Sequence, residues 1–247
     1  MNLSKKDLAI LDKFEFEVPP VGIKFFPTRP DQLERLNGRM ALCEMLKKAQ
    51  EGNAFYADLE NHTCDAGPYV LGQAEAPEPF ISGRFGAGLK IFGEPRSGGR
   101  LYQYIPRILK GTVHSVVFSP VSKLTFDPDV LVLLTKTQQT EIILRAMSYR
   151  TGEMWSSKLS AAIGCAWIFV YPYMSGKLNY ITAGLGHGMR RRHLFPEGHQ
   201  IISIPFDLLP SMLKTLQEMP WVLPAYQPDG MEFVGRLLTE LGIAPPK

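Results

Sequence analysis

The sequence feature that most constrains the fold is a fully apolar stretch that leads directly into a helical pattern. DPDVLVLLT, at residues 127–135, predicts a buried strand. Thr137 then provides an N-cap for a helix that we expect to continue to about Arg150, where Thr151 and Gly152 end it. A strand followed by a helix in this way is a βα unit, so the fold combines strands and helices.

The rest of the chain predicts elements of both kinds. Further strands are expected at residues 21–26, 55–60, 113–120, 166–170 and 199–205. Further helices are expected at residues 4–13, with Ser4 as the cap, and at 31–51, 155–163, 206–219 and 230–241. Because no repeat and no linker interrupts them, we predict one α+β domain over residues 1–247. It contains a mixed sheet, βα units and an irregular, Gly/Pro-rich insertion at about 60–100.

Charge and hydropathy exclude two classes of partner. With a net charge of +3, the chain lacks the strongly basic face expected of a nucleic-acid binder. No apolar run approaches the roughly 18 residues of a membrane helix, and the charged start MNLSKKDLAILDK does not resemble a signal peptide. We therefore predict a cytoplasmic protein that binds neither nucleic acid nor membrane. A homodimer is the default oligomer, because symmetric dimers are the commonest.

The three cysteines, Cys43, Cys64 and Cys165, carry the most distinctive chemistry. An odd, low count does not indicate a disulfide framework, so the thiols are core groups, nucleophiles or metal ligands. Cys43 falls on the apolar face of the helix expected at 31–51, and Cys64 lies in a polar, turn-prone segment. Their spacing matches no ferredoxin motif, and three separate buried thiols remain an alternative.

Several stretches of the chain resemble the motifs of one protein family. They are PVGIKFF (20–26), Cys43-Glu44, FYADLENHTCDAGPYVLG (55–72), DPDVLVLL (127–134), YRTG (149–152), Cys165, YPYMSGK (171–177) and ISIPFDLL (202–209). Together they resemble the domain of unknown function 169 family over nearly the whole chain. This resemblance implies an anaerobic setting, because the family is common in anaerobes and archaea, but it implies no particular reaction.

Our leading hypothesis is that Cys43, Cys64 and Cys165 bind one [4Fe–4S] cluster, since thiolates are the usual ligands of such clusters. Three cysteines would leave one iron without a protein ligand. Such an open iron would allow redox or Lewis-acid chemistry on a small molecule. His62 is a candidate fourth ligand or proton donor, and Asp65 either orients it or caps the turn. Whether the protein is an enzyme is left undecided.

A second candidate group is the glycine-rich, basic stretch GLGHGMRRRH at residues 184–193. Backbone amides at Gly186 and Gly188 would form an anion-binding nest, with Arg190 as our first choice of bidentate partner and Arg192 as the other. The alternative is an exposed turn with solvated arginines.

Three other functions remain open. A zinc site formed by the three cysteines and His62 is less expected, because the paired short spacings of structural zinc sites are missing. Cys64 activated by His62 would be a nucleophile. The last alternative is a protein that binds a small anionic molecule without a metal. In that case the cysteines would be structural. Its pocket would lie at the strand ends near residues 127–135 and 166–172.

Overall fold

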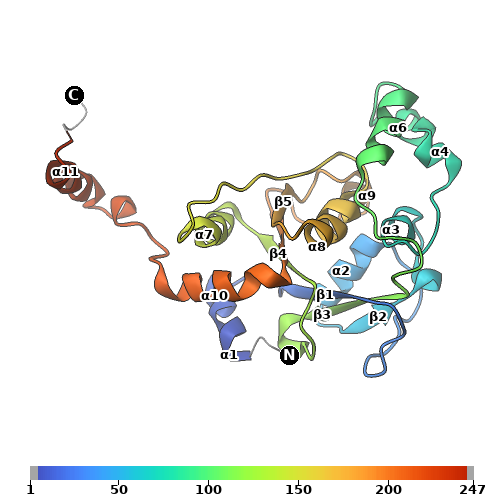
Figure 1. The fold of residues 1–247 in the computed structure, drawn as a ribbon, viewed down its shortest axis with the longest axis horizontal. Helices are drawn as coiled ribbons and strands as arrows, with labels where there is room; N and C mark the ends of the chain where they lie inside the picture. Colours follow the sequence, from blue (N-terminus) through green and yellow to red (C-terminus); the bar gives the residue numbers. More distant parts are fainter. Residues whose placement is uncertain (1–4, 244–247) are drawn as a thin grey trace.

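The computed structural model describes residues 5–243, which form a central sheet with helices on both faces (Figure 1). The strands are β1 Val21–Phe26, β2 Phe55–Ala57, β3 Ser115–Pro120, β4 Val130–Thr135, β5 Asn179–Thr182 and β6 Gln200–Pro205. The α-helices are α1 Lys5–Leu8, α2 Leu42–Gln50, α3 Ala66–Val70, α4 Glu78–Ile81, α5 Arg84–Gly88, α6 Pro95–Tyr104, α7 Thr137–Ser148, α8 Tyr171–Ser175, α9 His187–Arg191, α10 Leu209–Glu218 and α11 Gly230–Glu240. The α+β class is therefore confirmed.

The order of the strands is β2-β3-β1-β4-β6-β5, and all five neighbouring pairs are antiparallel. The predicted mixed sheet is therefore wrong for the described strands. β4 does lead into α7, as expected of a βα unit, but the chain returns as β5, which pairs only with β6. Because β6 lies between β4 and β5 and runs antiparallel to both, the two strands of the crossover never pair directly.

The position of β4 explains why its sequence is apolar throughout. Val130, Val132 and Leu134 pack into a core with α2 and α3, whereas Leu131 and Leu133 pack into a second core with α7 and α10. Successive side chains of a strand point to opposite faces, so a strand covered on both faces needs apolar residues at every position. The sheet therefore separates two cores.

The helix that carries Cys43 is shorter than the predicted span of residues 31–51. It begins at Leu42, and residues 31–41 run beside the segment around β2. The backbone N–H groups of Leu36 and Met40 donate to the carbonyls of Tyr56 and Asn61 instead of to a helix. Tertiary pairing thus overrides an apolar spacing that favoured a helix.

The segment of residues 164–175 is helical, so the predicted strand at 166–170 is wrong. Its centre, Ala166–Val170, is a π-helix that continues into α8, and all five residues of this centre are buried. A short apolar run does not distinguish a buried strand from a buried helix. Pro172 lies where the π-helix passes into α8.

Residues 60–100 contain α3, α4, α5 and the start of α6, joined by turns and bends. Residues 155–163 form no helix, so the helix predicted there is wrong. Lys158 instead pairs with the Asn179 side chain through both its N–H and its carbonyl, which holds this segment against β5.

The remaining predictions concern the two ends of the chain. Ser4, the expected cap of the first helix, lies outside the described residues. α11 lies apart from the helices that cover the sheet (Figure 1). Between residues 5 and 243, no helix is long and apolar enough to cross a membrane.

Candidate functional site

All three cysteines line one cavity of about 270 Å³. Cys43 lies in the first turn of α2, Cys64 directly precedes the N-cap of α3, and Cys165 lies at the start of the helical stretch 164–175. Residues of α9 and of the segment that contains α4, α5 and α6 complete the lining. The volume falls just below the roughly 300–1,000 Å³ of typical small-molecule sites.

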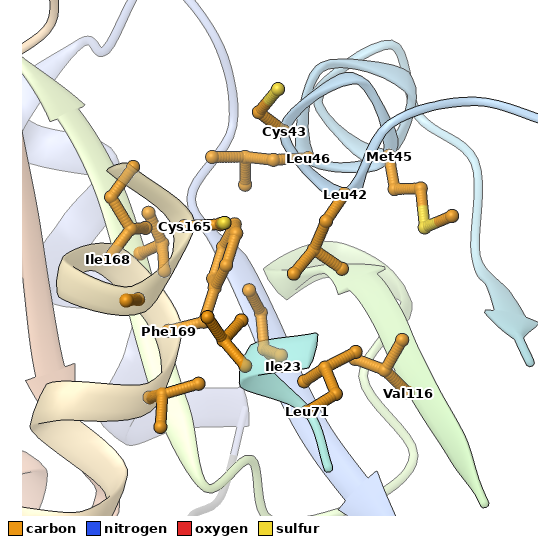
Figure 2. Packing of buried hydrophobic residues seen from close by; sticks show 14 of the residues in the cluster. Ile23, Leu42, Cys43, Met45, Leu46, Leu71, Val116, Cys165, Ile168 and Phe169 are labelled. Atoms are coloured by element: carbon orange, nitrogen blue, oxygen red, sulfur yellow. The ribbon is translucent and has the colours of Figure 1, made fainter. Parts of the chain in front are cut away.

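The core beneath the cavity fixes two of these thiols. Cys43 and Cys165 come from two different helices that pack into the same core, together with Leu46 and Phe169 (Figure 2). In this view the Cys43 thiol points away from the buried leucines of α2. The start of α2 is held by Glu44, whose carboxylate accepts the N–H of Ala41 at 2.6 Å.

Burial determines the protonation of these thiols. It raises the pKa of Cys43 to about 11, although nearby Arg192 acts in the opposite direction. Burial also raises the pKa of Cys165 well above its ordinary value, even though the N–H groups of Cys165 and Ala166 favour the thiolate. Negative charge on Cys64 would raise both pKa values further, so the three thiols lie within electrostatic reach of one another.

Sharing a cavity is not the same as forming a compact ligand set. Within residues 5–243, no group of three or more His, Cys, Asp or Glu side chains is arranged to hold a metal ion. A single zinc ion needs all its ligands roughly 2.0–2.3 Å from one centre. A cubane cluster binds each thiolate through a different iron, so its ligands lie farther apart.

The backbone before Cys165 is strained. Ile163 has φ of 54°, a left-handed conformation that β-branched residues rarely adopt, and it lines the cavity. A Cβ at Gly164 or at Gly186 would lie 2.2 or 2.3 Å from the Met189 Cε. The two glycines therefore leave room for Met189 in the cavity wall. Strained conformations of this kind accumulate at functional sites.

His62, the candidate fourth ligand, is not among the residues that line this cavity. Its side chain is 4% exposed and its ring packs against Gly67. Neither ring nitrogen has a hydrogen-bond partner in the described chain, although Gln73 lies nearby. Burial lowers the pKa of His62 to about 4, so the ring is neutral at pH 7. Asp65 does line the cavity and is exposed.

The structure separates the arginines of α9. Arg190, our first choice for binding an anion, lines a different cavity of about 680 Å³. Arg191 and Arg192 line the thiol cavity. Arg192 donates to the Gly188 carbonyl at 3.0 Å, and its Nε lies 3.5 Å from a Glu44 oxygen. Successive helix residues point about 100° apart, so the sequence alone did not decide which arginine faces the cavity.

The two glycines of the predicted amide nest, Gly186 and Gly188, both line the thiol cavity. The N–H of His187, between them, donates to the Ala161 carbonyl at 3.0 Å. That bond ties α9 to the segment that precedes Cys165.

Sequence reasoning missed the aromatic part of the cavity. Phe80, Phe85, Phe92 and Tyr102 all line it. The three phenylalanines come from the segment expected to be irregular, and Tyr102 lies just after it. Burial raises the pKa of Tyr102, and negative charge on Cys64 or Cys165 would raise it further, so its phenol lies near these thiols. The only signal was a concentration of aromatic residues among glycines, because the helices are too short to show a period.

Together, the fold and the cavity define an α+β protein in which three distant cysteines surround one small pocket. The model of the domain of unknown function 169 family, described as "Uncharacterised ArCR", matches residues 9–215. The chain therefore belongs to this family, as its motifs indicated. The matched range contains all three cysteines and the arginines of α9. Comparisons with curated proteins and with solved structures find no match.

Proposed function

We propose that this protein binds one [4Fe–4S] cluster through Cys43, Cys64 and Cys165, with one iron left open toward a small molecule. One observation carries the proposal: the three cysteines of the chain are far apart in sequence, yet all line one cavity. Independent structural thiols would have no reason to meet. The proposal keeps the cytoplasmic, oxygen-poor setting expected from the sequence.

Local groups would stabilise the anionic thiolates that such a cluster needs. Cys43 lies near the N-terminus of α2, the positive end of the helix dipole, and the charge of Arg192 favours its thiolate. The N–H groups of Cys165 and Ala166 favour the thiolate of Cys165. Hydrogen bonds to cluster sulfurs are among the groups that tune such sites.

Cluster insertion must displace protons from the thiols. The pKa values of Cys43 and Cys165 are raised in the metal-free protein, so both are protonated at pH 7. Metal ligands must be deprotonated, and binding therefore releases protons and becomes more favourable as the pH rises.

A bound cluster with an open iron would supply Lewis-acid or electron-transfer chemistry. The chain's own contribution is to hold a proton beside the thiols. Tyr102 keeps its phenol protonated because burial raises its pKa, and so it offers a hydrogen-bond donor near Cys64 and Cys165.

The test is anaerobic reconstitution of the full chain with iron and sulfide. We expect a brown protein that retains iron and acid-labile sulfide in equal amounts after desalting. Cys64→Ala should retain neither, whereas Thr63→Ala, a matched change at the exposed neighbour on the same cavity, should retain both. A colourless protein without iron would refute the proposal.

The second candidate function is binding of a small anion without a metal, with the cysteines as structural thiols. Arg191 favours it, because this exposed cation lines the cavity without a hydrogen-bond or ion-pair partner in the described chain. The pocket expected at two strand ends is not formed, since residues 166–172 are helical. Cysteine-to-alanine variants that still bind an anion would support this function over the first.

A further inference from the structure

We infer that the thiol cavity binds a small aromatic carboxylate, whose charge faces Arg191 and whose ring lies against Phe85 and Phe92. This inference rests on the proposed function, because the ligand would lie beside the cluster. The inference names the chemical class of the small molecule, which the proposed function leaves unspecified.

The aromatic wall gives the first argument. Phe80 and Phe85 stack with ring centroids 4.4 Å apart and an interplanar angle of 21°. Although Phe85 lines the cavity, 45% of its surface is exposed, and the neighbouring Leu89 is exposed to 37%. Both residues also line a neighbouring hollow beside Pro79 and Arg84. The part of their apolar surface that faces the thiol cavity favours an apolar ligand, because burying it removes apolar surface from water.

Glycines make this wall rigid before any ligand arrives. A Cβ at Gly83 would lie 2.0 Å from the Pro95 carbonyl oxygen, so the starts of α5 and α6 touch through their backbones. A Cβ at Gly86 would lie 2.8 Å from the ring of Phe92, so this ring rests on the backbone of α5. A preformed wall loses less conformational entropy when a ligand binds.

The charges around the cavity give the second argument. Arg192 is engaged by Glu44 and by the Gly188 carbonyl, which leaves Arg191 as the cation free for a ligand among the described lining residues. A guanidinium pairs with a carboxylate through two parallel hydrogen bonds. Asp65 also lines the cavity and repels a carboxylate. The ligand's charge would therefore point toward α9.

The volume gives the third argument. The cavity of about 270 Å³ would also hold the cluster, so the space left beside it limits the ligand to about one ring with a carboxylate and excludes an extended cofactor. The ligand class is therefore a single-ring monocarboxylate, and benzoate is the simplest probe.

The test is calorimetric titration of the reconstituted protein, under anaerobic conditions, with benzoate, acetate and benzylamine. Benzoate should bind more tightly than acetate, which lacks the ring, and more tightly than benzylamine, which carries the opposite charge. Arg191→Gln should weaken benzoate binding roughly tenfold or more, whereas Arg190→Gln, its matched control on the other cavity, should not. Asp65→Asn should strengthen binding.

The ring contact has its own matched pair. Phe85→Ala should weaken benzoate binding roughly fivefold or more, and Tyr104→Ala, an exposed aromatic residue off the thiol cavity, should leave it unchanged. Equal effects of the two arginine variants, or tighter binding of benzylamine, would overturn the inference.

Iron content is measured in the same samples, so the two proposals fail separately. A brown protein that does not bind benzoate keeps the cluster and refutes the ligand class. A colourless protein that binds benzoate through Arg191 refutes the cluster and supports the ligand class.

Discussion

The two faces of the sheet differ in how they are built. On one face, α7 and α10 are regular amphipathic helices that close a core of leucine, isoleucine and methionine side chains. On the other face, α2 and the 164–175 stretch are followed outward by the short, glycine-interrupted helices α3 to α6 and by α9. The second face encloses the thiol cavity.

The two faces therefore differ in role: the first mainly stabilises the fold, and the second carries the candidate functional groups. The thiols and the unpartnered arginine lie on the second face, together with the strained backbone at Ile163. Long helices with a clear period bury apolar surface efficiently, whereas short helices bring many chain ends, and hence many functional groups, to one place. Changes on the two faces should therefore have different consequences.

The largest effects should be seen when one residue of each face is truncated. Leu213→Ala in α10, where Leu213 is 2% exposed, should lower the free energy of unfolding by about 3 kcal/mol and leave the iron content of the reconstituted protein unchanged. Cys64→Ala should cost about 1 kcal/mol or less and abolish iron binding. Urea unfolding and iron analysis of the same preparations measure both. Iron loss in Leu213→Ala, measured where that variant is folded, would break the comparison.

A second prediction concerns the buried histidine of the cavity face. The pKa of His62 is about 4 in the folded protein against 6.5 ordinarily, so only the unfolded chain takes up a proton between these values. Stability should therefore fall by about 3 kcal/mol as the pH drops from 6.5 to 4. His62→Leu should remove that part of the pH dependence, whereas Leu213→Ala should retain it. An unchanged slope in His62→Leu would contradict the assignment.

A third prediction concerns the protons of the thiols. Because the pKa values of Cys43 and Cys165 are raised, the apparent affinity for the cluster should increase with pH between 7 and 9. The expected rise is about tenfold per pH unit for each thiol that loses its proton. Competition with an iron chelator, corrected for the chelator's own protonation, measures it. A flat profile would mean that the thiols are already ionised or are not ligands.

The smallest predicted change in the free energy of unfolding should be the same on both faces. Glu15 and Lys90 are exposed, with φ of 50° and 59°, the left-handed region that favours glycine. Glu15 follows a helical turn on the first face, and Lys90 lies in the segment that lines the thiol cavity. Both are replaced by glycine. Each should stabilise the protein by about 0.5–1 kcal/mol in urea unfolding. Destabilisation by Lys90→Gly alone would show that this lysine has a structural role that the contacts do not reveal.

The sequence predicted the first face better than the second, for a physical reason. On the first face, α7 and α10 have periodic apolar patterns and were found close to their observed bounds, as were β1 and β4 in the sheet and α11 apart from it. On the cavity face, α2 was predicted to begin at Asp31, because nothing local shows that Leu36 and Met40 pair with the segment around β2. The π-helical run at 166–170 was predicted as a strand, because a segment buried on all sides shows no helical period of apolar residues.

The candidate site was predictable in part. Side-chain chemistry and the family resemblance together selected the three cysteines as candidate metal ligands, with separate buried thiols as the alternative. Arg190 was the first choice and Arg192 the second, and Arg191 was missed, because the rotation of a five-residue helix decides which arginine faces the cavity and no sequence pattern indicates it. The aromatic wall depends on backbone contacts between Gly83 and α6, which are separated in sequence and become visible only in the fold.

Mössbauer spectroscopy of the full chain, reconstituted anaerobically with isotopically enriched iron, tests the central claim most directly. A cluster held by Cys43, Cys64 and Cys165 predicts a cubane spectrum in which one iron differs from the other three. A spectrum with four equivalent irons would contradict the open site. A sample that retains no iron would contradict the cluster itself.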